Sequence, residues 1–125
     1  MAWFLGGAEA QSQTMTQEHV IRIPIKPGMK QLVVDALEAL RARQSELDDS
    51  RARRDVQQNI CFVDSIEGTD WLFMYRRADN LQRAGAQFLL SRAGVDREVA
   101  RVLLEATRVE AACVVDVSFS WRSKE

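Results

Sequence analysis

The chain has 125 residues, of which 46% are apolar and 28% are charged, and its formal net charge is -1. A chain of this length can bury one hydrophobic core, whereas a second domain would need more residues. The balance of acids and bases gives no attraction to nucleic acid or to an anionic membrane surface, and no apolar run reaches the roughly 20 residues of a bilayer-spanning helix. We therefore expect one globular domain with neither nucleic acid nor a membrane as its partner.

The first residues, MAWFLGGAEAQSQT, resemble a signal peptide only superficially, because they lack a basic start and their apolar core is short. Met15 directly precedes the first strand-like run. We predict that residues 1–14 are a flexible extension, with a docked N-terminal arm as the alternative, and that residues 15–125 form the domain. The expected compartment is the cytoplasm.

The first half of the chain predicts a strand followed by a helix. Apolar residues alternate from His19 to Ile25, which is the period of a β-strand, and the residues KPG end the run. From Met29 to Leu47 the apolar residues recur at helical spacing. The run LDDSRARRDVQQ that follows has mixed charge and no apolar stripe, so we expect a solvated helix end and loop without a site.

The second half predicts a hairpin, two helices and a last strand. The strand-like runs Asn59–Ile66 and Asp70–Arg77 are joined by the residues EGT, a connection typical of a β-hairpin. Asp79 and Asp96 are placed to cap two helices, and Val109–Trp121 returns to alternation. This order predicts an α+β fold with the ferredoxin-like split β-α-β unit, a four-stranded antiparallel sheet in spatial order 4-1-3-2 with helices on one face.

Such a sheet leaves one face uncovered, and the side chains on that face decide between monomer and dimer. If the isoleucines of the first strand lie under the helices, alternation puts Val20, Arg22 and Pro24 on the open face. On the last strand we expect Val114, Asp116 and Ser118 on that face. Because the first and last strands are neighbours in this order, Arg22 and Asp116 are expected to approach each other.

The segments VIRIPIKPG, LVVDALEALRARQSEL and CFVDSIEGTDWLFMYRRADNLQRA, with the closing strand, resemble a group of short bacterial proteins of unknown function in the dimeric α+β barrel superfamily. The resemblance covers roughly residues 18–120. It implies a homodimer in which two sheets pack face to face, with a small-molecule pocket between sheet and helices or inside the barrel. The superfamily includes polyketide cyclases, cofactor-independent quinone-forming monooxygenases, lactone isomerases and haem-binding enzymes, and fold alone does not select among them.

Two polar residues of the first strand are candidates for a site. The resemblance implies that Arg22 faces an enclosed cavity, and the alternative is a structural pair with Asp116 across an interface. His19, the only histidine, is a candidate base, with a half-exposed structural residue as the alternative. A single histidine cannot form a His-rich metal site, although it would suffice as a haem ligand.

The later strands add aromatic and acidic candidates. Trp71, Phe73 and Tyr75 alternate on one face, which favours core or dimer packing or an aromatic-walled cavity in which Tyr75 donates a proton. Asp64 and Asp116 are acids within apolar runs, a setting that favours shifted pKa values and acid–base work. Two cysteines, Cys61 and Cys113, are expected as free thiols on opposite edge strands, beyond disulfide reach.

The chain has no phosphate loop, metal-ligand spacing, serine elbow or dinucleotide fingerprint, so we predict no cofactor. Our hypothesis is a homodimeric barrel that binds a small organic substrate, as a cofactor-independent cyclase or isomerase of specialised, polyketide-like or antibiotic metabolism. Arg22 would polarise a carbonyl or enolate and Asp116 or Asp64 would move a proton, in a cavity shaped by Trp71, Phe73, Tyr75 and Ser118. The alternatives are a cofactor-independent monooxygenase of an aromatic substrate and a non-catalytic ligand-binding or interaction protein.

Overall fold

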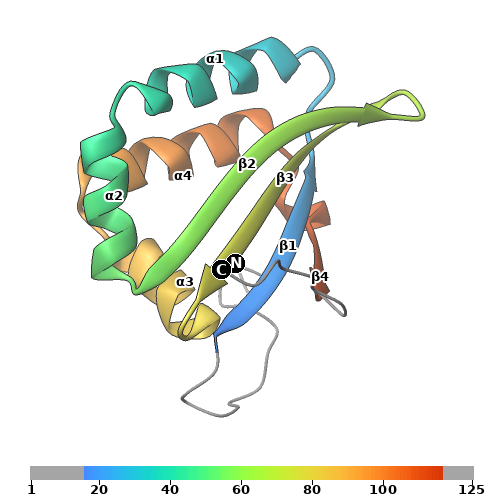
Figure 1. The fold of residues 1–125 in the computed structure, drawn as a ribbon. Coiled ribbons are helices and arrows are strands. Elements are labelled where there is room, and N and C mark those ends of the chain that lie inside the picture. The colour runs from blue at the N-terminus through green and yellow to red at the C-terminus, as the bar shows by residue number, and fades with distance from the viewer. Residues whose placement is uncertain (1–15, 117–125) are drawn as a thin grey trace, which may run out of the picture.

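The computed structural model describes residues 16–116. In chain order its elements are β1 (Gln17–Pro24), α1 (Lys30–Arg41), α2 (Gln44–Arg53), β2 (Val56–Ile66), β3 (Thr69–Ala78), α3 (Leu81–Leu90), α4 (Gly94–Ala106), the 3-10 helix η2 (Val109–Ala111) and β4 (Cys113–Asp116) (Figure 1). The predicted extension, residues 1–14, and the predicted strand residues after Asp116 lie outside the described part of the chain. Within that part, no helix is both long enough and apolar enough to cross a membrane.

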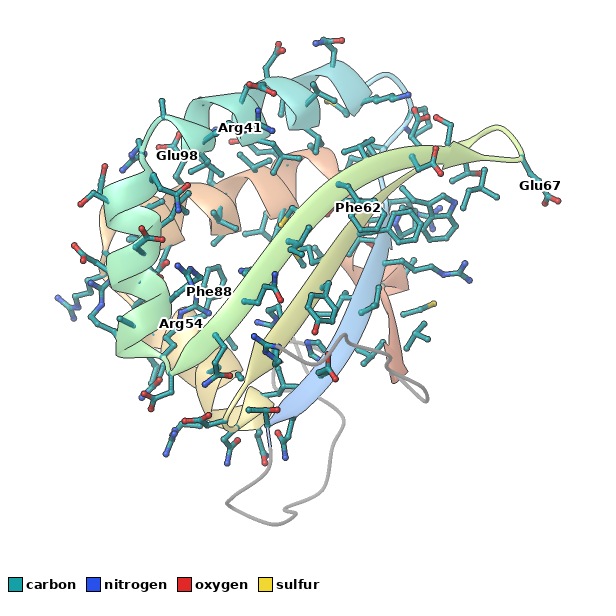
Figure 2. The ribbon with its side chains drawn as sticks, in the orientation of Figure 1. Arg41, Arg54, Phe62, Glu67, Phe88 and Glu98 are labelled. Atoms are coloured by element: carbon teal, nitrogen blue, oxygen red, sulfur yellow. The ribbon has the colours of Figure 1, made fainter. Side chains whose placement is uncertain are left out.

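The strands form one antiparallel sheet in the order β2-β3-β1-β4, which is the predicted 4-1-3-2 order read from the other edge. The helices lie against one face of this sheet, and among residues 16–116 no helix or strand covers the other face (Figure 1; Figure 2). The core forms between these layers, where Ile21 and Ile23 of β1 and Ile25 just after it pack with apolar residues of β3 and the helices. The predicted ferredoxin-like α+β fold is confirmed.

The first helical segment differs from the prediction. The pattern from Met29 to Leu47 predicted one helix, but α1 ends at Arg41 and α2 begins at Gln44. Although α2 has no apolar stripe, hydrogen bonds along its surface, such as that from the Gln44 side chain to Asp48, support it. The expectation of a solvated helix end and loop after Leu47 is wrong, because α2 packs on β2 and α4 and buries Ser50.

The hairpin prediction is confirmed, with strands longer than expected. β2 and β3 pair as far as Ile66 and Thr69, so only Glu67 and Gly68 form the turn. Both turn residues have positive φ, 51° and 82°, as in the turns that match the twist of paired strands.

The helix caps also differ. Asn80 rather than Asp79 caps α3, since the Asn80 side chain accepts a hydrogen bond from the Arg83 backbone N–H. Asp96 lies in the first turn of α4, where it is buried, while Ala93 occupies the cap position.

The register of β4 contradicts the predicted pair of Arg22 and Asp116. Arg22 is opposite Cys113, whereas His19 is opposite Asp116. The register therefore does not bring Arg22 and Asp116 opposite each other. Val114 is opposite Ile21 and packs against the core, so it lies on the helix-covered face and not on the open face as predicted. The prediction failed because Cys113, Val114 and Val115 form one apolar run, in which alternation cannot assign a face, while Ser118 lies outside the described residues.

Candidate functional site

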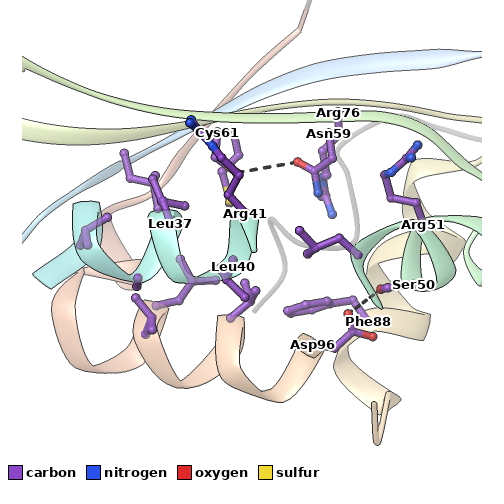
Figure 3. Close-up of a pocket in the computed structure, with 18 of the residues that line it drawn as sticks. Leu37, Leu40, Arg41, Ser50, Arg51, Asn59, Cys61, Arg76, Phe88 and Asp96 are labelled. Atoms are coloured by element: carbon purple, nitrogen blue, oxygen red, sulfur yellow. Dashed lines mark hydrogen bonds between the residues drawn. The ribbon is translucent and has the colours of Figure 1, made fainter. Parts of the chain in front are cut away.

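A cavity of about 300 Å³ lies between the helix-covered face of the sheet and helices α1, α2 and α4 (Figure 3). It exists because the chain turns between α1 and α2, so that these helices border the cavity on two sides instead of continuing as one rod (Figure 1). β2 and β3 supply its sheet side.

The cavity has an apolar end and a polar end. In Figure 3, Leu37 and Leu40 of α1 lie at one end, whereas Ser50, Arg76 and Asp96 gather toward the other. Further apolar residues line it from the sheet and from the helices α3 and α4, among them Leu72, Met74, Phe88, Val99 and Val102. Apolar walls with a few convergent polar groups are the usual composition of small-molecule sites.

Arg54, the first residue after α2, is the least compensated cation of the polar end. The residue is only 7% exposed, and its guanidinium carbon lies 5.4 Å from the centre of the Phe88 ring. The Nε atom is buried and has no hydrogen-bond partner among the described residues. Burial lowers the pKa of Arg54, although an arginine guanidinium remains charged at neutral pH.

Arg76 is the second buried cation, and it comes from β3. Its Nε donates a hydrogen bond to Nε2 of His19 at 3.1 Å. Burial lowers the pKa of Arg76 to about 10, with a smaller contribution from the charge of Arg54. Burial also lowers the pKa of His19 to about 4, so the imidazole is neutral and accepts through Nε2.

Asp96 fixes the polar end by joining three segments. Its carboxylate accepts hydrogen bonds from the hydroxyls of Ser50 and Ser91, each at 2.5 Å, and lies 4.0 Å from the guanidinium of Arg53. Ser50 belongs to α2 and Ser91 follows α3, so one carboxylate on α4 holds both neighbours. The negative charge also partly offsets Arg54.

Cys61 and Asn59 line the cavity from β2. The Cys61 thiol is 3.9 Å from the Asn59 side-chain oxygen, as the dashed line in Figure 3 marks. Desolvation of the sulfur raises the pKa of the Cys61 thiol to about 11, although the residue as a whole is exposed. The thiol is therefore protonated at neutral pH and is not an activated nucleophile.

The structure divides the sequence-predicted site residues between the two faces of the sheet. His19 faces the helices, where it is buried. The open face carries Arg22, Asp64, Trp71, Phe73 and Tyr75. Of Asp116 only the register position is known, and both cysteines are free, on the edge strands as predicted.

The open-face residues contact one another rather than the cavity. The Arg22 guanidinium lies 4.6 Å from the centre of the Trp71 ring, and Phe73 stacks on Phe62 at 4.9 Å. The Tyr75 hydroxyl donates a hydrogen bond to the carboxylate of Glu18. Asp64 is exposed and accepts a hydrogen bond from the Ser65 backbone N–H.

Sequence reasoning missed Arg54, Arg76 and the role of Asp96. Arg76 could have been found, because it continues the buried alternation of Leu72 and Met74 along β3. Arg54 lies in a mixed-charge run with no periodic pattern, and only the packing of α2 distinguishes it from its neighbours. Among residues 16–116 no group of three or more potential metal ligands comes together.

The fold and the cavity define a ferredoxin-like α+β protein with helices on one face of its sheet and a partly enclosed pocket beneath them. Residues 16–119 match the family described as Family of unknown function (DUF6176), and the chain belongs to that family. No curated protein matches the chain.

Two solved structures are similar to it. The first is a dimeric protein of unknown function and ferredoxin-like fold from Bacteroides fragilis, with 15% identity and a TM-score of 0.50, over 83% of this chain and 96% of that one. The second is the de novo designed protein Ferredog-Diesel, with 14% identity and a TM-score of 0.46, over 87% of this chain and 93% of the design. At such low identity the first likeness supports the fold alone.

Proposed function

We propose that the protein is a homodimer that binds a small organic molecule in the cavity between sheet and helices. The observation that carries the proposal is the cavity itself, a partly enclosed volume of about 300 Å³ with an apolar end and a polar end. A site of this size suits a ligand with one polar group and an apolar body. This is the pocket position that the superfamily resemblance implies.

The bare face of the sheet supports the dimer. Ile60, Phe62 and Val115 are 44%, 47% and 50% exposed there, beside the partly exposed rings of Trp71 and Phe73. A contiguous apolar surface of this kind is normally covered by a partner. The Bacteroides fragilis protein of similar fold is dimeric, which agrees with the proposal. Two sheets packed through these faces would form an α+β barrel.

We extend the proposal to catalysis by a cofactor-independent isomerase or cyclase. In such a step Asp96, an acid of the cavity lining, would act as the base that takes the proton from a C–H bond beside a carbonyl and returns it to the product. Negative charge then develops on the carbonyl oxygen, and a buried guanidinium stabilises that charge without a metal. Arg54 and Arg76 are the guanidiniums in position to do so. Arg22, Asp64 and Tyr75 would contribute only if the dimer encloses a second cavity between its sheets.

Pocket-filling substitutions test the binding proposal. Val99 lines the cavity from α4, whereas Leu104 of the same helix is 57% exposed outside it. In a ligand-observed NMR screen of small organic fragments, Val99→Phe should abolish binding seen with the wild-type protein. Leu104→Phe, which adds the same ring outside the cavity, should leave binding unchanged. Binding that survives Val99→Phe would contradict the proposed position of the site.

Solvent exchange tests the catalytic extension. In D₂O, the protein should accelerate the exchange for deuterium of the proton beside the carbonyl of 2-oxo acids and cyclic ketones. ¹H NMR measures this exchange as the loss of that proton's signal. Oxygen consumption without exchange would favour the monooxygenase, and binding with neither would favour a non-catalytic ligand-binding protein. Arg22→Met should leave exchange unchanged if the helix-side cavity is the site, and a loss would return Arg22 to the mechanism.

A further inference from the structure

We infer that the ligand of this cavity is an organic acid whose carboxylate binds to the guanidinium of Arg54 and whose apolar body lies toward Leu37 and Leu40. The inference rests on the proposed function, because it names the class of molecule that the same cavity binds. It is carried by the hydrogen bonding of Arg54, by the charge of the lining and by the division of the cavity into two ends.

Arg54 lacks the hydrogen bonds that a buried guanidinium requires. Among residues 16–116 its Nε is buried without a partner, and its guanidinium lies over the Phe88 ring. The charge of Asp96 attracts this guanidinium, whereas the charges of Arg53 and Arg76 repel it. An unsatisfied buried donor destabilises the folded protein, and more so when the group is charged. A carboxylate meets this requirement best, since its two oxygens match the two parallel N–H groups along a guanidinium edge.

The lining of the cavity carries more positive than negative charge. Among the described residues, four arginines line it, Arg41, Arg51, Arg54 and Arg76, against one acid, Asp96. Arg41 and Arg51 have acidic partners outside the lining, Glu38 at 3.8 Å and Asp48 at 2.6 Å. Asp96 already accepts from two serine hydroxyls. An anion entering beside Arg54 therefore meets a field that favours it.

The apolar end decides which anion fits. Leu37 and Leu40, with Leu72 and Val99 among their neighbours in the lining, offer no donor to an inorganic ion. A free phosphate would leave these walls unfilled and would bring a second charge that the site must neutralise. A monocarboxylate with an aromatic or aliphatic body uses both ends of the cavity.

The experiment compares phenylacetate with its neutral counterpart phenylacetamide and with inorganic phosphate. Each compound is titrated into the full chain, and ¹H–¹⁵N NMR spectra monitor the binding. Phenylacetate should shift backbone signals of α2, β2 and α4 around the cavity, with an affinity at least about tenfold higher than that of phenylacetamide. Arg54→Gln should remove that preference and leave the affinity for phenylacetamide unchanged. Arg97→Gln, an equal change of charge at an exposed residue of α4 that does not line the cavity, should preserve it.

Three results would overturn the inference. Equal binding of phenylacetate and phenylacetamide in the wild-type protein would show a neutral ligand class and would leave the proposed binding function intact. Tighter binding of phosphate than of phenylacetate would show a site for inorganic anions. Failure of both organic probes to shift the cavity signals would reject the proposed function together with the inference.

If Arg54→Gln does not fold, Arg54→Lys takes its place. This variant should lose at least about threefold in phenylacetate affinity, because a lysine cannot bind two oxygens in parallel.

Discussion

Arg76 and His19 are joined by a hydrogen bond between the sheet and the helices. The guanidinium Nε of Arg76 donates to the imidazole Nε2 of His19, 3.1 Å away. Both residues are nearly inaccessible, at 1% and 2% exposure. The histidine can accept this bond only while it is neutral, because a protonated imidazole has no acceptor. The position of a cavity-lining cation therefore depends on the protonation state of a histidine that does not itself line the cavity.

This dependence predicts a loss of stability in mild acid. The pKa of His19 is lowered from 6.5 to about 4 in the folded protein, so the unfolded chain takes up the proton first as the pH falls. The contribution of His19 to the free energy of unfolding should thus be constant above pH 6.5. It should fall between pH 6.5 and about 4 and level off below that pH. The total effect is on the order of 3 kcal/mol.

Urea unfolding at pH 7.5 and pH 5 measures this effect. His19→Gln is the matched control, because the glutamine side-chain oxygen accepts from Arg76 at either pH and does not titrate. The variant should lose most of the difference between the two pH values. An equal pH dependence in wild-type protein and variant would show that another group titrates.

A second prediction concerns Asp96 and the buried charge of Arg54. Asp96→Ala should destabilise the protein by about 3 kcal/mol, because it removes the acceptor of two serine hydroxyls and leaves the guanidinium uncompensated. Ser50→Ala, which removes one hydrogen bond, should cost only about 1 kcal/mol.

A double-mutant cycle separates charge from hydrogen bonding in that prediction. With Arg54→Met already present, Asp96→Ala should cost at least about 1 kcal/mol less than it does alone, since no buried cation is then left behind. Thermal unfolding of the four proteins gives the coupling. Strictly additive effects would mean that Asp96 acts only through the serines.

The turn between β2 and β3 supplies a third prediction. Gly68 has φ of 82° with open space around the position of an added Cβ, so Gly68→Ala should cost about 1 kcal/mol through backbone strain alone. Glu67 also has positive φ, 51°, and Glu67→Asn should stabilise the hairpin by about 0.5 kcal/mol because asparagine tolerates this conformation. Denaturant unfolding measures both changes, and effects of the same sign would contradict the assigned turn geometry.

The fold could be predicted because its determinants are local. Alternation along β1 and a two-residue turn after β2 are both visible within a few residues of the chain. The face of β4 could not, because Cys113, Val114 and Val115 form one apolar run without alternation, and the predicted approach of Arg22 and Asp116 failed with it.

The candidate site was largely hidden for a related reason. Its polar end joins the end of α2, the end of β3 and the start of α4, and no pattern in the sequence relates these three segments. His19 stands out in the sequence as a polar residue of an apolar strand, but nothing in the sequence relates it to its partner Arg76. Arg76 lies on β3, whose aromatic residues indicate a site on the opposite face. Burial of Arg54 follows from the packing of α2, which its composition did not predict.

The last prediction concerns assembly through the open face of the sheet. Phe62 is 47% exposed on edge strand β2 and stacks on Phe73 of β3, so a partner sheet would meet this pair of rings. Phe62→Glu places a charge in that contact and should shift the protein to monomer at micromolar concentration. Light scattering coupled to size-exclusion chromatography should give about twice the chain mass of 14.2 kDa for the wild-type protein and the single-chain mass for the variant.

Leu104→Glu is the control for this prediction, because Leu104 is 57% exposed on α4, on the other side of the molecule from the bare sheet face. It should remain dimeric, since the substitution adds the same charge away from the proposed contact. A wild-type protein that is monomeric at this concentration would refute the dimer and would leave the aromatic face without a partner copy. A dimer that persists in Phe62→Glu but dissociates in Leu104→Glu would move the interface from the sheet to the helices.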